Sequence, residues 1–80
     1  MYVVYAIKSV SRKYIYVGLT NNIEQRFSEH NSGKNKTTRP YRPFILIYTE
    51  IVETRIVARK REKYLKSGVG KEFLKNILAI

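Results

Sequence analysis

The sequence has no cysteine, no tryptophan and no aspartate, and only two prolines and four glycines. Without cysteine, neither disulfide bonds nor thiolate zinc sites can hold the chain together. The expected location is therefore a reducing compartment, the cytoplasm. Because glutamate is the only acidic residue type, any carboxylate ligand of a hard metal ion must come from among the six glutamates. These are too scattered along the chain for a two-metal carboxylate cluster.

Long apolar runs are also absent. No stretch approaches the roughly 18 residues that a membrane span requires. The run from Tyr2 to Ile7 is too short for the hydrophobic region of a signal peptide, and Lys8 follows it. We therefore expect no membrane insertion. The 80 residues suffice for one domain, 1–80, with a thin core because a chain of this size buries only about 60% of its unfolded surface.

Positive charge is abundant. Sixteen lysines and arginines stand against six acidic residues, which gives a formal net charge of +10. Such an excess indicates a polyanionic partner, either nucleic acid or an anionic membrane surface, and we favour nucleic acid. The alternative is a basic accessory protein whose charge serves solubility or ribosome contact.

The pattern of apolar residues predicts three strands and three helices in the order β-β-α-β-α-α. The first strand is apolar throughout and is therefore expected at the centre, so that the sheet order is 2-1-3. This is an α+β fold, a small three-stranded antiparallel sheet flanked by helices. The expected strands are 2–7, 14–17 and 44–48. The expected helices run from Asn22, capped by Asn21, to Gly33, from Thr54 to Ser67, and from Lys71 to Ile80 after a break at Gly68–Gly70.

Two tyrosines of the first hairpin are candidates for a shared site. A four-residue loop, 9–12, would pair Lys8 with Lys13 and Tyr5 with Tyr16. Residues opposed on antiparallel strands share a face, so both phenols would point the same way. A loop with an odd number of residues would place Tyr16 on the other face. The alternative role for both tyrosines is packing, since tyrosine is common in strands.

Further polar side chains follow at helical spacing. Asn22, Arg26 and His30 are four residues apart and share one helix face. Arginine offers a planar fork for phosphate, and histidine exchanges a proton near neutral pH. Glu62 is the single acid of a basic segment, and one carboxylate is enough for a Mg²⁺ that retains water ligands. The alternatives are a solvated helix surface and, for Glu62, an ion pair with Arg59 or Lys66.

Taken together, these residues resemble the GIY-YIG nuclease family, in particular its short stand-alone bacterial members. Its first motif corresponds to Val3-Val4-Tyr5 and its second to Tyr16-Val17-Gly18, followed by Arg26, His30 and Glu62 in the family's order. The resemblance covers nearly the whole chain. Each short motif is weak alone, whereas the ordered set is fairly specific.

The resemblance implies a one-metal hydrolysis of phosphodiester bonds. Tyr16, alone or with Tyr5, would take the proton from the attacking water, while Arg26 would stabilise the charged phosphorane. His30 would assist Tyr16 or bind phosphate, and Glu62 would hold Mg²⁺ or Mn²⁺. Gly18 and Asn22 would have structural roles. Four cations of the loop 34–43 would follow the nucleic-acid backbone without reading bases: Lys34, Lys36, Arg39 and Arg42.

The chain also departs from the family pattern. Val3 replaces the first glycine of the motif, and Leu19 stands where some members carry a lysine that helps to organise the site. The resemblance implies a structure-selective endonuclease, with DNA favoured over RNA, related to repair or recombination. Because no specificity domain is attached, the protein would either prefer particular DNA shapes, ends or branches by itself or need a partner protein for specificity. The alternative is a non-catalytic nucleic-acid-binding module on the same fold.

Overall fold

The computed structural model describes residues 1–78 and contains three strands, three α-helices and one short 3₁₀ helix. Their order along the chain confirms the predicted β-β-α-β-α-α succession. The strands are β1 (Tyr2–Ser9), β2 (Ile15–Thr20) and β3 (Phe44–Val52). The helices are α1 (Ile23–Ser32), η1 (Arg39–Tyr41), α2 (Arg55–Lys66) and α3 (Gly68–Leu78).

The sheet has the predicted order β2-β1-β3, with β1 antiparallel to both neighbours. The central position of β1 agrees with the apolar run 2–7 that makes up most of it, because both of its faces are covered. β3 is longer than the predicted 44–48 and continues to Val52, with a bulge opposite Ala6 and Ile7. Both β2 and β3 are edge strands, so each has one edge without a neighbouring strand.

The predicted register of the hairpin is wrong by two residues. Tyr5 lies opposite Gly18 rather than Tyr16, and Tyr16 lies opposite Ile7. The loop is longer than expected, because six residues separate the paired Lys8 and Ile15. Since the shift is even, it preserves the alternation of side chains, and both phenols still occupy one face of the sheet.

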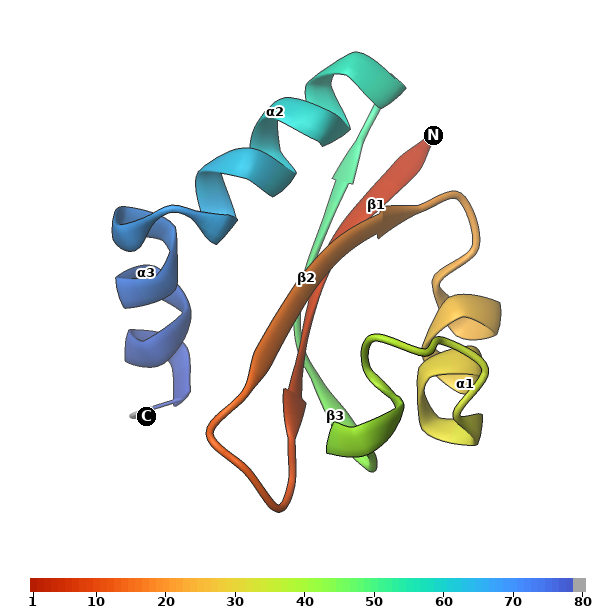
Figure 1. The fold of residues 1–80 in the computed structure, drawn as a ribbon. Helices are drawn as coiled ribbons and strands as arrows, with labels where there is room; N and C mark the ends of the chain where they lie inside the picture. Colours follow the sequence, from red (N-terminus) through yellow and green to blue (C-terminus); the bar gives the residue numbers. More distant parts are fainter. Residues whose placement is uncertain (79–80) are drawn as a thin grey trace.

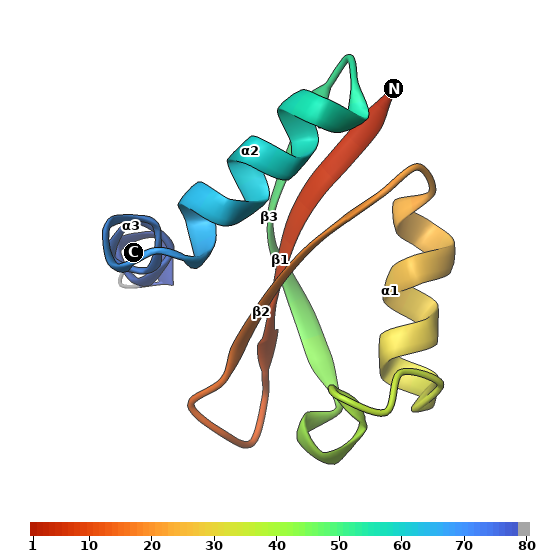
Figure 2. The same ribbon diagram turned by 45° about the horizontal axis from the view of Figure 1, so that its top comes forward.

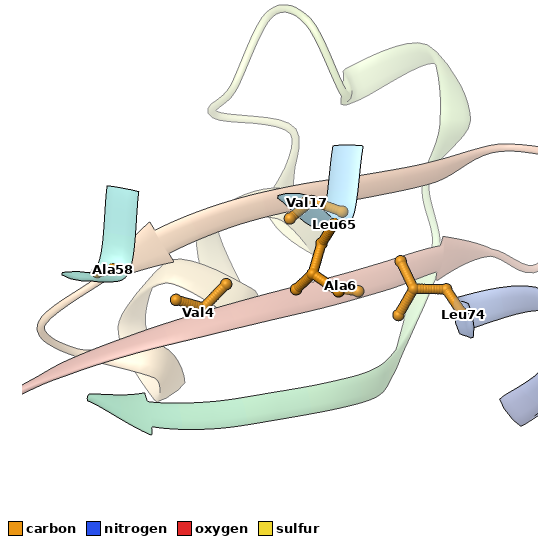
Figure 3. Packing of buried hydrophobic residues seen from close by; sticks show 6 residues of the cluster. All are labelled: Val4, Ala6, Val17, Ala58, Leu65 and Leu74. Atoms are coloured by element: carbon orange, nitrogen blue, oxygen red, sulfur yellow. The ribbon is translucent and has the colours of Figure 1, made fainter. Parts of the chain in front are cut away.

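Helices cover both faces of the sheet, with α1 on one side and α2 and α3 on the other (Figures 1 and 2). Side chains alternate along β1 between these two layers, so each face has its own small core. Figure 3 shows the core beneath α2 and α3, which consists of Val4, Ala6, Val17, Ala58, Leu65 and Leu74. The core on the α1 side is built around Tyr5, Ile7 and Phe44. None of the helices within residues 1–78 is long and apolar enough to cross a membrane.

Two helix starts differ from the prediction. The N-cap of α1 is Asn22, not Asn21, and its side-chain oxygen accepts a hydrogen bond from the Gln25 amide at 3.2 Å. α3 begins at Gly68, so the Gly68–Gly70 segment forms its first turn instead of breaking the chain. The break lies at Ser67, whose backbone is extended. The predicted end of this helix at Ile80 falls outside the described residues.

Candidate active site

A cleft of about 330 Å³ lies along the free edge of β2, between α1 and α2. β1 and β2 contribute Tyr5, Tyr16 and Gly18, and the turn after β2 contributes Asn21. The facing helices contribute the charged side chains: Arg26 from α1, and Arg55, Arg59 and Glu62 from α2. The cleft therefore combines phenols, guanidinium groups and a single carboxylate from four separate elements.

Tyr5 and Tyr16 lie side by side at the base of this cleft, with ring centroids 6.3 Å apart. Gly18 makes this arrangement possible, because it lies opposite Tyr5 and leaves room for the ring. A Cβ atom at Gly18 would lie 2.7 Å from the Tyr5 hydroxyl and 3.1 Å from the Tyr16 ring. Tyr5 is 1% exposed, whereas Tyr16 is partly exposed. Tyr16 is thus the phenol that is more open to a substrate.

His30 does not line the cleft, although it was expected to share a helix face with Arg26 and to assist Tyr16 or bind phosphate. Its side chain is 0% exposed and lies behind Tyr5. Its Nε2 is hydrogen-bonded to the Tyr5 hydroxyl and its Nδ1 to the Thr38 hydroxyl, both at 2.8 Å. Because the imidazole is buried and both nitrogens are occupied, His30 positions Tyr5 and has no direct access to a phosphate.

Burial sets the protonation of this pair. It raises the pKa of the Tyr5 phenol far above its ordinary value of 10.0, and nearby Tyr16 adds to the effect. It also lowers the pKa of His30 below 6.5, and the positive charge of Arg26 lowers it further. Tyr5 therefore keeps its proton and His30 is neutral at pH 7.

Arg26 and Glu62 face the cleft from opposite helices. Arg26 is exposed, and its guanidinium lies 3.7 Å from the Glu29 carboxylate. The Glu62 side chain is 13% exposed, with Lys66 Nζ at 3.2 Å and Arg59 Nε at 3.8 Å. The ion pairs anticipated for Glu62 therefore form, yet the carboxylate still lines the cleft.

The donor set fits a metal ion that needs one protein carboxylate. Within residues 1–78, no three histidine or acidic side chains form a cluster able to hold a metal ion. Glu62 is the single carboxylate among the residues that line the cleft. Mg²⁺ commonly takes one or two protein carboxylates and completes its shell with water and phosphate oxygens. Such an ion is compatible with Glu62, whereas a two-metal centre is not.

Arg55 and Arg59 were not identified as site residues from the sequence. They line the cleft beside Glu62 and are exposed. The spacing of residues 55, 59 and 62 is i, i+4 and i+7, which places all three side chains on one helix face. That spacing was a usable signal, although it is common on solvated helices.

The predicted phosphate-binding loop lies away from the cleft, at the C-terminal end of α1. None of its four cations lines the cleft. Arg39 donates a hydrogen bond from Nε to the Gly33 carbonyl at 2.6 Å, and the Arg42 guanidinium lies against Gly33. Lys34 and Lys36 are exposed. The binding role of these residues stays a prediction.

Comparisons with known proteins agree with this architecture. The family model described as the GIY-YIG catalytic domain matches residues 1–76. A UPF0213 protein of Staphylococcus haemolyticus is 36% identical over 75 residues, which cover 92% of this chain and 90% of that protein. A UPF0213 protein of Syntrophus aciditrophicus is 44% identical over 62 residues, 75% of this chain and 71% of that one. The solution structure of a UPF0213 protein from Bacillus halodurans is 31% identical, with a TM-score of 0.56, and the match covers 96% of this chain and 85% of the other.

Proposed function

Since the chain belongs to the GIY-YIG family, whose catalytic domains are nucleases, we propose that it is a divalent-metal-dependent endonuclease that hydrolyses phosphodiester bonds in structured DNA. The observation that carries this proposal is the cleft on the edge of β2. It brings Tyr16, Arg26 and Glu62 together from three separate elements, of which α2 is distant in the sequence from the other two. These are a hydroxyl, a phosphate-binding fork and a carboxylate, the groups that such hydrolysis requires.

Tyr16, in its phenolate form, is the group that receives the proton of the attacking water. Tyr5 is unsuited to this role because burial keeps its phenol protonated and because its hydroxyl is hydrogen-bonded to His30. Tyr5 instead fixes the position of the neighbouring Tyr16 ring. The function of His30 is therefore to hold the tyrosine pair in place.

Arg26, Arg55 and Arg59 bind the phosphate and stabilise the charge that develops on its oxygens during attack. Glu62 would hold Mg²⁺ or Mn²⁺, which when bound polarises a phosphate oxygen and stabilises the leaving group. Leu19 lines the cleft where some family members carry a lysine. In this chain the two arginines of α2 supply positive charge to the same hollow.

The second candidate function is a non-catalytic module that binds nucleic acid through the same cleft. Two observations favour it: Leu19 adds an apolar side chain to the cleft, and Lys66 and Arg59 already lie beside the Glu62 carboxylate. In either case a partner protein would supply specificity, and we place the activity in repair or recombination of DNA.

Cleavage assays distinguish the two functions. The substrates are single-stranded, blunt, nicked, overhanging and branched DNA, with matching RNA, in the presence of Mg²⁺. We expect the wild type to cut at least one structured DNA, and Glu62→Gln to lose on the order of 100-fold in rate while it still binds. Glu53→Gln removes an exposed carboxylate outside the cleft and should behave as the wild type. If no substrate is cut and all three proteins bind equally, the chain is a binding module.

A further inference from the structure

A second hollow adjoins the cleft. It has a volume of about 690 Å³ and lies between the β1–β2 hairpin and α3. β2 contributes residues 15–17 to this groove and residues 16 and 18–20 to the cleft. Tyr16 belongs to both hollows, so the groove and the cleft follow consecutive parts of one strand edge. A linear polymer whose reacting phosphate lies in the cleft can continue directly into the groove.

The rim of the groove is positively charged. Five lysines line it, namely Lys8, Lys13, Lys66, Lys71 and Lys75, and no acidic residue does. Lys8 donates hydrogen bonds to the carbonyls of Ser9 and Arg12, and Lys66 lies beside Glu62. The three remaining lysines are exposed and form no ion pair with any side chain of residues 1–78. Their ammonium groups are available for a polyanion.

The floor of the groove is apolar. Its accessible apolar side chains are Ile15 and Leu78, with Tyr14 and Tyr16 at the hairpin side. Val17, Leu65 and Leu74 also line it, but they belong to the core and are at most 5% exposed. A double helix keeps the faces of its bases stacked inside and presents phosphates, sugars and base edges, so an apolar floor offers it little. An unpaired strand exposes the faces of its bases, which pack on apolar and aromatic side chains while phosphates meet lysines. The charged rim and the apolar floor together therefore suit a single strand of nucleic acid.

We propose that this groove binds unpaired nucleotides that flank the scissile phosphate, so that the preferred substrate carries a single-stranded arm. This proposal rests on the proposed nuclease function for its biological meaning, but it concerns binding and can be tested without cleavage. The strand leaves the cleft past Tyr16 and Lys66, whose ammonium lies 6.0 Å from the centre of the Tyr16 ring. It then passes between Lys13 of the hairpin and the two exposed lysines of α3.

Binding of the full chain is measured by fluorescence anisotropy in EDTA, which prevents metal-dependent cleavage. The probes are a labelled single-stranded oligonucleotide, a duplex with a single-stranded overhang and a blunt duplex. The test variant is Lys71→Gln/Lys75→Gln on the groove. The matched control is Lys60→Gln/Lys63→Gln, which removes the same charge from exposed positions of α2 outside both hollows.

We expect the groove variant to lose roughly tenfold in affinity for the single strand and the overhang at about 0.1 M salt. On the single strand, the slope of log Kobs against the logarithm of the salt concentration should fall in magnitude by about 1.4. The affinity of the control variant for each probe should change less than twofold. The affinity of the groove variant for the blunt duplex should also change less than twofold. Equal losses in both variants would overturn the proposal, because net charge alone would then explain them. Unchanged nucleic-acid binding with lost affinity for an amphipathic acidic peptide would also overturn it and assign the groove to a protein partner.

The nuclease function and the groove can fail separately. If the wild type cuts no substrate but the groove variant still loses single-strand binding, the proposed catalysis is wrong and the groove assignment stands. If the wild type cuts overhanging DNA and the groove variant cuts and binds it as well as the control does, the groove assignment is wrong and the nuclease stands.

Discussion

Tyr5 is held from two sides. Its hydroxyl is hydrogen-bonded to the buried His30 at 2.8 Å, and its ring passes directly over the backbone of Gly18. A side chain fixed in this way keeps its neighbour Tyr16 in one orientation, which the proposed role of the Tyr16 hydroxyl requires. Substitutions at Gly18 and at His30 disturb this arrangement in different ways and lead to separate predictions.

Gly18→Ala should impair cleavage more than folding. The new Cβ would lie 2.7 Å from the Tyr5 hydroxyl and 2.9 Å from its ring carbon, so the buried ring must move. We expect a loss of about 10- to 100-fold in kcat and a destabilisation of about 1–3 kcal/mol from overpacking. Cleavage kinetics and urea unfolding measure the two effects. A variant with wild-type kcat would show that the position of Tyr5 is not important for the reaction.

His30 should make stability depend on pH. Burial lowers the pKa of the folded imidazole below its unfolded value of 6.5, so the unfolded chain binds a proton that the folded chain does not. The free energy of unfolding therefore falls as pH drops through about 6.5 toward the folded pKa, and it is fully retained above pH 7. Thermal unfolding between pH 5 and 8 measures this dependence.

His30→Gln is the control for that experiment. It removes the titrating group and should flatten the curve above pH 5, at a uniform cost of about 1–3 kcal/mol because Tyr5 and Thr38 lose a partner. Glu50 also contributes, since hydrogen bonds from Arg61 lower the pKa of its carboxyl. The contribution of Glu50 to stability is lost only as pH falls below the ordinary carboxyl pKa of 4.5, which lies outside the chosen pH range. An unchanged curve in His30→Gln would contradict the assignment.

At the scale of elements, the junction of α2 and α3 depends on one close contact. A Cβ atom at Gly70 would lie within 3 Å of the backbone of Tyr64 and Leu65, whereas one at Gly68 would meet nothing within 4 Å. Both glycines occupy the first turn of α3. The contact brings the start of α3 against the end of α2, and it places the α3 lysines beside the groove.

Gly70→Ala should therefore separate the two helices. We expect a loss of about 2–4 kcal/mol in the free energy of unfolding, in the range of the larger backbone and overpacking effects, because backbone atoms cannot move aside as a flexible side chain can. Gly68→Ala, the matched control, should be neutral or stabilising by up to about 1 kcal/mol. Urea unfolding of the two variants decides between these outcomes. Equal stabilities would show that the helices have room to adjust.

The elements also show how far the sequence predicts this structure. Apolar runs are sufficient for the order of elements and for the sheet order 2-1-3, since the run 2–7 is apolar on both faces and is therefore expected at the centre. The hairpin register was missed by two residues because loop length depends on the fit of the turn and not on apolar pattern. The shared face of Tyr5 and Tyr16 survived the error, since side-chain alternation has a period of two.

The position of His30 was harder to predict. Its spacing from Arg26 places both on one helix face, but the helix packs so that Arg26 meets solvent and His30 meets Tyr5. The orientation of the helix is consistent with a hydrogen bond between His30 Nδ1 and the hydroxyl of Thr38, which lies eight residues later. Periodicity identifies a face of a helix, whereas the depth of each residue on it is set by partners that are distant in sequence.

At the scale of the molecule, positive charge is concentrated around the edge of β2. Glu62 is the single acid lining the cleft, and none lines the groove. The loop with Lys34 and Lys36 lies beyond the other end of α1, a helix of 10 residues that is roughly 15 Å long. A duplex that extends from the cleft along α1 would need about four to five base pairs to reach that loop.

The loop lysines should therefore contribute to binding of a duplex arm and not of a single strand. For Lys34→Gln/Lys36→Gln we expect the salt slope of log Kobs on a 12-base-pair duplex with an overhang to fall by up to about 1.8. The slope on the single-stranded oligonucleotide should stay that of the wild type, because that strand occupies the groove. Anisotropy titrations between about 50 and 200 mM salt, with Lys60→Gln/Lys63→Gln as control, measure both. Unchanged duplex binding would show that the sequence-based assignment of this loop is wrong, and equal losses on both substrates would show that its charge acts without regard to the path of the nucleic acid.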